Sequence, residues 1–234
     1  MEHKRLTLFA GHYGSGKTNI AVNYAIALAR EGKRAVIGDL DIVNPYFRTK
    51  DSAARLEKAG VELISPQFAN TNVDLPALPA EAYRLVEDKA SYGIMDIGGD
   101  DRGAYALGRY VPAIKAENNY RMVFVANCYR PLTRTPEEAL EVMREIENAC
   151  GLAFTDIVNN SNLGPETTAQ TVLDSVAYIE KLSQLSGLPV FAHTAEMEVA
   201  QTLDGKLSPV FPLQLQEKYF DLPSQKPGNR PLWG

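Results

Sequence analysis

Lys17 and Thr18 end a glycine-rich segment whose residue types and spacing suit the binding of a polyphosphate. Residues 11–18 read Gly-His-Tyr-Gly-Ser-Gly-Lys-Thr and fit the phosphate-loop pattern G-x-x-x-x-G-K-[ST] at every fixed position. Glycines allow the tight turn that brings successive backbone N–H groups onto one anion. The lysine ammonium then reaches the β- and γ-phosphates, and the threonine hydroxyl binds Mg²⁺. The segment therefore predicts a site for a nucleoside di- or triphosphate with Mg²⁺, and we expect that nucleotide to be ATP or ADP.

We assign contacts with the nucleotide to the whole loop and to the residue after it, and we assign a catalytic role to Lys17 as well. The predicted nucleotide-binding residues of this segment are Gly11, His12, Tyr13, Gly14, Ser15, Gly16, Lys17, Thr18 and Asn19.

The flanks of the loop have the composition of a strand and a helix. Residues 5–10 form a short, mostly apolar run, which is typical of a buried strand. Residues 19–30 are rich in alanine, have apolar residues at helical spacing, and end before Gly32. The order strand, glycine loop, helix places the bound phosphates at a helix N-terminus, where backbone donors and the helix dipole favour an anion.

Three aspartates follow two other strands of the predicted sheet. Asp39 and Asp41 end the apolar segment 34–41, and Asp96 follows the apolar run 93–95. In open parallel sheets the ligand lies beyond the carboxyl ends of the strands. Because Mg²⁺ on a phosphate needs only one or two carboxylates, we predict Thr18, Asp39 and Asp96 as its ligands. Asp41 is predicted to orient the attacking water; a turn or helix-cap role is the structural alternative for each aspartate.

Strands and helices alternate along the chain, which indicates an α/β fold with three αβα layers and a mostly parallel sheet. We expect about seven strands, at residues 5–10, 34–41, 61–64, 92–97, 120–127, 154–160 and 188–193. The helices are expected at residues 19–30, 52–59, 79–89, 102–116, 136–149 and 166–186. Thr135 is the expected N-cap of the fifth of these helices, because Glu137 and Glu138 follow in its first turn.

The predicted domain organisation is one phosphate-loop domain over residues 1–207, followed by a proline-rich tail over residues 208–234. Pro209, Pro212, Pro223, Pro227 and Pro231 rule out a long helix in the tail. Its apolar residues predict packing along the domain or across to a partner subunit.

Composition argues against several classes of partner. The net charge is −5 with no basic block, so binding to nucleic acid is not expected. No apolar run reaches the roughly 18 residues of a membrane helix, and the first residues lead straight into a strand, so we expect a cytoplasmic protein that does not bind membranes. Cys128 and Cys150 match no metal-binding spacing and are expected to be two reduced thiols.

The three motifs together resemble the MinD/ParA/CobQ-type branch of the P-loop NTPases, within the SIMIBI class. They are residues 14–18, residues 36–42 and residues 94–99, and the likeness extends from the first strand to about Glu196. The resemblance implies that Asp39 and Asp41 lie in switch I and Asp96 in switch II. It also implies that Asn159 or Asn160 reads adenine, while the segment 193–196, with Thr194, closes over the base.

One position departs from that resemblance. MinD and ParA proteins have a lysine where this chain has His12, and that lysine reaches the phosphates of the partner subunit. An imidazole does not replace a fixed ammonium in stabilising transition-state charge. Either hydrolysis is slow or another cation substitutes, and the candidates are Arg102, Arg130 and Arg134. A surface role is the alternative for each arginine.

Three functions remain open from the sequence. The preferred one is a nucleotide-switch ATPase that hydrolyses ATP, forms a homodimer, and acts on an unidentified protein or small-molecule partner. The second is a ligase that phosphorylates a carboxylate. A loop that lacks a lysine at position 12 also resembles the loops of dethiobiotin synthetase and cobyrinic-acid amidase. The third is a module that binds the nucleotide without turning it over.

Overall fold

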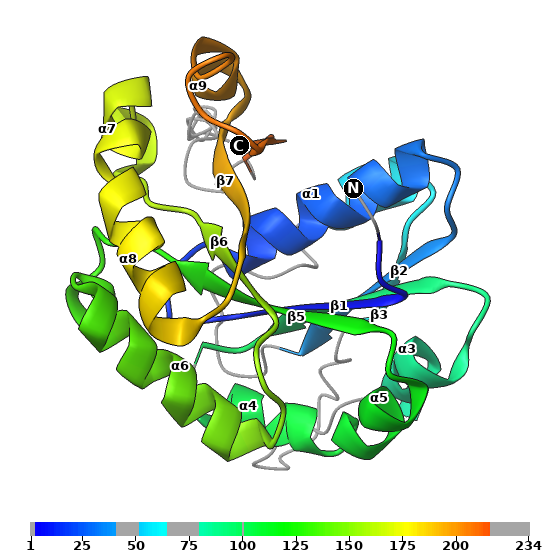
Figure 1. The fold of residues 1–234 in the computed structure, drawn as a ribbon. Coiled ribbons are helices and arrows are strands. Elements are labelled where there is room, and N and C mark those ends of the chain that lie inside the picture. Colours follow the sequence, from blue (N-terminus) through cyan, green and yellow to red (C-terminus); the bar gives the residue numbers. More distant parts are fainter. Residues whose placement is uncertain (1–2, 41–51, 65–79, 100, 216–234) are drawn as a thin grey trace, which may run out of the picture.

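Eight parallel strands form one sheet in the part of the chain described by the structure, a computed structural model that covers residues 3–40, 52–64, 80–99 and 101–215 (Figure 1). The strands are β1 (Leu6–Ala10), β2 (Ala35–Leu40), β3 (Glu62–Ile64), β4 (Tyr92–Ile97), β5 (Tyr120–Ala126), β6 (Asp156–Asn159), β7 (Val190–Glu196) and β8 (Val210–Leu213). Their spatial order is β3-β2-β4-β1-β5-β6-β7-β8. The predicted αβα architecture is therefore confirmed, with one strand more than expected.

Helices cover both faces of this sheet (Figure 1). They are α1 (Lys17–Arg30), α2 (Ala53–Lys58), α3 (Arg84–Glu87), α4 (Asp101–Gly108), α5 (Val111–Glu117), α6 (Pro136–Cys150), α7 (Ala169–Asp174), α8 (Val176–Ser186) and α9 (Met197–Thr202). Helices α1 and α2 share one hydrophobic cluster with the sheet, whereas α3, α4, α5, α6 and α8 share the other. None of the helices in the described residues is long and apolar enough to cross a membrane.

Strand β1 lies at the centre of the sheet, where it pairs with β4 on one side and β5 on the other. All five of its residues are buried, because both faces of the sheet are covered. Its side chains alternate between the two hydrophobic clusters: Leu8 and Ala10 lie on the α6 side, and Phe9 lies on the α1 side. The strand thus delivers the glycine-rich loop to the middle of the sheet's carboxyl edge.

Strand β8 was not predicted, and it begins the segment that we assigned to the tail. It pairs with β7 in parallel register, with Thr194 opposite Phe211 and Ala195 opposite Pro212. Proline lacks a backbone donor and is tolerated on an edge strand, which is the position of β8 in the described sheet. Residues 216–234 of the predicted tail lie outside the described residues.

Two predicted helices are each divided into two. The segment 102–116 forms α4 and α5, because Pro112 is tolerated in the first turn of a helix but not in its interior. Most of the segment 166–186 forms α7 and α8, which meet at Ser175. The Ser175 hydroxyl donates to the carbonyl oxygen of Val172 at 2.7 Å, and such a bond competes with helix continuation.

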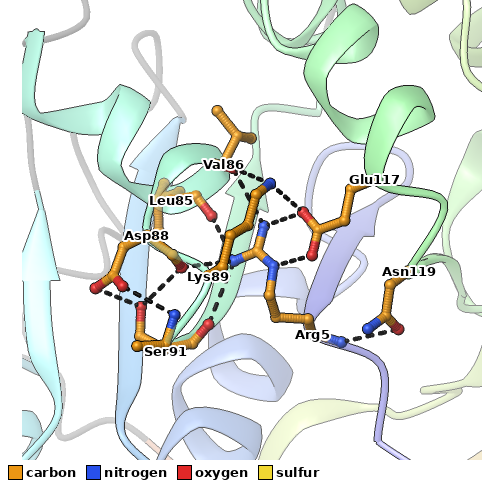
Figure 2. A network of polar contacts seen from close by, with 9 residues as sticks. Arg5, Leu85, Val86, Asp88, Lys89, Ser91, Glu117 and Asn119 are labelled. Carbon is orange, nitrogen blue, oxygen red and sulfur yellow. Dashed lines mark hydrogen bonds and ion pairs between the residues drawn. The ribbon is translucent and has the colours of Figure 1, made fainter.

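Arg5 fixes the amino end of β1, whereas the glycine-rich loop follows the carboxyl end of this strand. Figure 2 shows the polar contacts of Arg5. Its guanidinium pairs with Glu117 at the end of α5 and donates to the carbonyl oxygens of Leu85 and Asp88 at 3.0 and 3.1 Å. Lys89 donates to the same carboxylate at 2.7 Å. A short helix such as α3 leaves its last carbonyls without helical partners, and Arg5 supplies donors for them. The network therefore fastens β1 to α3 and α5.

Candidate nucleotide-binding site

The glycine-rich loop connects β1 to α1 through backbone conformations that favour glycine. Gly14 has φ 74° and Gly16 has φ 95°, both in the left-handed region. Gly16 is the N-cap of α1 and offers no side-chain acceptor to the first turn of the helix. The N–H groups at the start of this 14-residue helix are therefore not capped by a side chain. This arrangement suits an anion placed at the helix N-terminus.

Lys17 and Ser15 are buried within the loop. Lys17 is 6% exposed, and its ammonium donates to the carbonyl oxygen of His12 at 3.2 Å, so the side chain folds back over the loop. The Ser15 hydroxyl is buried, and no group in the described part of the chain forms a hydrogen bond with it. A buried polar group of this kind normally has a partner. Both groups are consistent with a loop shaped to receive a polar ligand.

His12 and Tyr13 occupy the variable positions of the loop. The Nδ1 atom of His12 lies 3.0 Å from the carbonyl oxygen of Tyr13. A carbonyl only accepts, so this contact requires the proton on Nδ1. Tyr13 is 52% exposed. His12 is therefore engaged with its own loop, at the position where MinD and ParA proteins have a lysine.

Two close approaches hold the loop against neighbouring strands. A Cβ atom added at Gly16 would lie 2.1 Å from Nδ2 of Asn160, beyond the end of β6. A Cβ atom added at Gly99 would lie 2.7 Å from the backbone nitrogen of Tyr13 and 2.8 Å from Nζ of Lys17. Gly99 was absent from our predicted site residues, although the D-x-x-G pattern that starts at Asp96 ends on it. That pattern was the signal that could have identified it.

Asp39 and Asp96 are direct neighbours in the sheet. They are register partners between β2 and β4, and Asp96 is also paired with Phe9 of β1. Because paired residues of parallel strands point to the same face, both carboxylates lie on the face that α1 covers. Their residues are only 2% and 1% exposed. The structure thus brings together two of the predicted metal ligands, next to the strand that carries the loop.

These residues fit a Mg²⁺ ion that is bound mainly through phosphate. Thr18 is half-buried in the first turn of α1, on the sheet face that also carries Asp39 and Asp96. In the described part of the chain no three His, Cys, Asp or Glu side chains gather into a metal-binding group. An all-protein cage is thus absent there, and Mg²⁺ commonly takes one or two carboxylates while phosphate and water supply its other ligands.

Asn159 is completely buried and its amide is fully engaged with protein groups. Its Nδ2 donates to Ser175 Oγ at 2.9 Å and to His193 Nδ1 at 3.1 Å, while Oδ1 accepts from the backbone N–H of Ser161 at 3.2 Å. Burial lowers the pKa of His193 despite the opposing charge of Glu180, so the imidazole is neutral and its Nδ1 accepts. These contacts join β6, β7 and the junction of α7 and α8.

Asn160 connects the glycine-rich loop to the end of β7. Its Nδ2 donates to the carbonyl oxygen of Ser15 at 2.6 Å, and its Oδ1 accepts from the Thr194 hydroxyl at 2.6 Å. All three residues are buried. Asn160 and Thr194, which we predicted as residues of the same site, therefore lie beside the loop. Asn160 holds the loop backbone, and Thr194 holds the amide of Asn160. Contacts of Asn159, Asn160 and Thr194 with a base remain predictions.

Some predicted residues are outside the described part of the chain. Asp41 is one of them, as is the side chain of Arg102, whose backbone lies in α4.

Asn19 is half-buried in the first turn of α1, where its carbonyl oxygen accepts from Asn23 Nδ2 at 2.8 Å. Arg134 is exposed, whereas Arg130 reaches the loop and donates from Nε to the carbonyl oxygen of Gly14 at 3.0 Å.

Comparisons with solved structures bear on the fold of this chain. The cell division protein FtsY of Thermotoga maritima matches 79% of the chain at 16% identity with a TM-score of 0.51. The signal recognition particle 54 kDa protein of Aeropyrum pernix K1, solved in complex with GDP, matches 81% at 18% identity with a TM-score of 0.52. The signal recognition particle receptor FtsY of Elizabethkingia anophelis matches 81% at 18% identity with a TM-score of 0.51.

The chain has the αβα fold of the P-loop nucleotide-binding proteins. Its match spans 59%, 41% and 58% of the length of these three structures, respectively. At this level of identity the likeness concerns the fold alone. No protein-family model matches the chain, and a search of curated proteins finds no match.

Proposed function

We propose that this chain is a Mg²⁺-dependent nucleotide switch that binds a purine nucleoside triphosphate and hydrolyses it. The observation that carries the proposal is the loop between β1 and α1. Gly14 and Gly16 hold left-handed conformations, Lys17 folds over the loop, and the N-terminus of α1 has no side-chain cap. These features offer backbone donors, one fixed cation and a helix dipole to a polyphosphate.

The proposed roles of the other residues follow from their positions. The Lys17 ammonium binds the terminal phosphates, and Thr18, Asp39 and Asp96 hold Mg²⁺ directly or through water. Mg²⁺ would neutralise charge on the β- and γ-phosphates. Asp41 remains the proposed residue that orients the attacking water. We keep Asn160 and Thr194 as contacts near the base, in addition to their contacts with the loop.

The base of the proposed nucleotide is assigned by features outside the glycine-rich loop. The sequence resemblance favours ATP, and the similar structure from Aeropyrum pernix K1 holds GDP. The loop binds phosphate through backbone groups, which do not distinguish adenine from guanine. We propose ATP as the nucleotide and GTP as the alternative, to be decided by direct competition.

Exposed apolar side chains support a protein partner at the edge of the sheet that carries the loop. Tyr105, Leu132 and Leu163 are 66%, 57% and 45% exposed, and each follows the carboxyl end of a strand. Tyr13 and Met197 share this location and are also exposed. Large exposed apolar groups mark interaction sites when they gather on one face. We propose that nucleotide binding changes the association of this surface with a second copy of the chain.

Calorimetry with purified protein tests the nucleotide proposal. We expect saturable binding of ATP that requires Mg²⁺, and competition with GTP ranks the two bases. Lys17→Met should weaken ATP binding by about tenfold or more, because a hydrogen bond to a charged group contributes about 1.5 to 3 kcal/mol. Lys33→Met is the matched control, since Lys33 lies beyond the other end of α1.

Light scattering with and without a non-hydrolysable ATP analogue tests the proposed association. A mass that increases with the analogue in the wild type, and does not increase in Lys17→Met, supports the switch. Absence of Mg²⁺-dependent uptake of either triphosphate would contradict the whole proposal.

A further inference from the structure

Arg130 is anchored on the glycine-rich loop by a backbone carbonyl group, which carries no net charge. It follows β5, and its Nε donates to the carbonyl oxygen of Gly14 at 3.0 Å. The backbone N–H of Arg130 donates to the carbonyl oxygen of Asn127 at 3.2 Å, which fixes the turn that carries it. The turn after β5 therefore fixes the backbone of Arg130, and the loop fixes its guanidinium.

The charge of Arg130 is not compensated by any carboxylate in the described residues. Four other arginines pair with acidic side chains in the described residues: Arg5 with Glu117, Arg34 with Asp88, Arg84 with Glu62 and Arg121 with Asp156. Arg130 instead uses only Nε, on a carbonyl, and its two Nη groups form no hydrogen bond with the described part of the protein. A half-buried guanidinium therefore presents donors and a full positive charge beside the loop.

The turn that positions Arg130 is built by the buried residue Asn127. Its Oδ1 accepts from the backbone N–H of Tyr129 at 3.0 Å, and its carbonyl oxygen accepts from the Thr133 hydroxyl at 2.7 Å. Asn127 is 0% exposed, and its Nδ2 has no hydrogen-bond partner among the described residues. Together with the Ser15 hydroxyl, this gives two buried polar groups that lack partners, one in the loop and one at the base of the turn.

We propose that Arg130 binds the terminal phosphate of the nucleotide from within the same chain. The inference rests on the proposed nucleotide site and adds the cation that His12 does not supply. The guanidinium fork suits phosphate oxygens, and the carbonyl of Gly14 holds it in place before the nucleotide arrives. Arg130 thus distinguishes a triphosphate from a diphosphate, and no residue of a second subunit is needed for this contact.

The test compares the affinities for triphosphate and diphosphate. Calorimetry on the full chain measures Kd for ATP and for ADP, each with Mg²⁺, in the wild type and in Arg130→Gln. We expect ATP binding to weaken by about tenfold or more and ADP binding by less than threefold. Arg130→Lys keeps a charge but loses the fork, so its ATP affinity should lie between the other two.

Arg144→Gln is the matched control, because Arg144 is an exposed arginine of α6 that is not among the predicted site residues. Its ratio of ATP to ADP affinity should equal that of the wild type. If Arg130→Gln weakens both nucleotides equally, Arg130 only stiffens the loop and the inference is overturned. If the wild type binds neither nucleotide, the failure is that of the proposed function. Thermal denaturation without nucleotide confirms that each variant is folded.

Discussion

Gly99→Ala is expected to weaken binding of the Mg²⁺–nucleotide by about a hundredfold while leaving the chain folded. A Cβ atom at this position would lie 2.7 Å from the nitrogen and 2.8 Å from the Cα of Tyr13. Both atoms belong to the backbone, so no side-chain rotation relieves the clash. Either the loop or the end of β4 must move, and displacing one or two charge-assisted bonds to phosphate accounts for about 3 kcal/mol.

The control for this prediction is Gly108→Ala at the end of α4. The nearest atom to a Cβ at Gly108 is the carbonyl oxygen of Cys150, at 3.8 Å, which is an ordinary contact. Alanine is the better helix former, so this variant should bind nucleotide like the wild type and be equally or slightly more stable. Calorimetry with Mg²⁺–ATP measures both variants. Equal affinities for Gly99→Ala and Gly108→Ala would show that the loop tolerates displacement.

Glu117→Gln is expected to lower the free energy of unfolding by about 3 kcal/mol at neutral pH. Glu117 pairs with Arg5 (Figure 2), and the exposed fractions of the two side chains are 11% and 8%, respectively. Removing one charge of a buried pair leaves the other without compensation. The carbonyl oxygens of Leu85 and Asp88 still accept from Arg5 in the variant, but they carry no full charge. Urea denaturation at pH 7 gives the difference.

The same pair makes stability depend on pH. Burial alone would raise the pKa of Glu117, but hydrogen bonds from Arg5 and Lys89 outweigh it and hold the pKa below its ordinary value of 4.5. A carboxyl with a depressed pKa in the folded state contributes stability that is complete above the pKa of the unfolded chain. That contribution is lost as the pH falls through the lower pKa of the folded state. The gap between wild type and Glu117→Gln should therefore shrink below about pH 4.5.

Glu62→Gln is the matched control for the buried pair. Glu62 forms a similar two-bond contact with Arg84, but the two side chains are 40% and 45% exposed. Exposed pairs contribute at most about 1 kcal/mol, because water and salt screen them. A loss for Glu117→Gln as small as that for Glu62→Gln would contradict a structural role of the Arg5 network.

Local signals were sufficient to predict much of the fold. The Thr135 hydroxyl accepts from the backbone N–H of Glu138, and the Glu138 side chain accepts in return, so the predicted cap of α6 is a complete capping box. The glycine pattern located the loop, and the apolar runs located β2 and β4 with their terminal aspartates. These features depend on neighbours in the sequence, which pattern analysis reads directly.

Features that depend on contacts between distant segments were not predictable in the same way. Strand β8 contains Pro212, and only its place at the edge of the described sheet makes that proline acceptable. Arg130 was one of three arginine candidates, and the sequence could not show that its Nε donates to the carbonyl oxygen of Gly14, 116 residues away. The hydrogen bonds of the Asn159 amide to Ser175 and His193 also join segments that are distant in the sequence, so they were not predictable either.

The central place of β1 has a consequence for how the protein is made. Both neighbours of this strand come later in the chain, since β4 begins at Tyr92 and β5 ends at Ala126. A ribosome must therefore extend the polypeptide past that point before β1 can close its hydrogen-bond ladders. Such long-range pairing slows folding, and it leaves the first strand exposed on the nascent chain. The glycine-rich loop follows β1 directly. Although it is synthesised early, it is therefore among the last parts of this half of the sheet to acquire its shape.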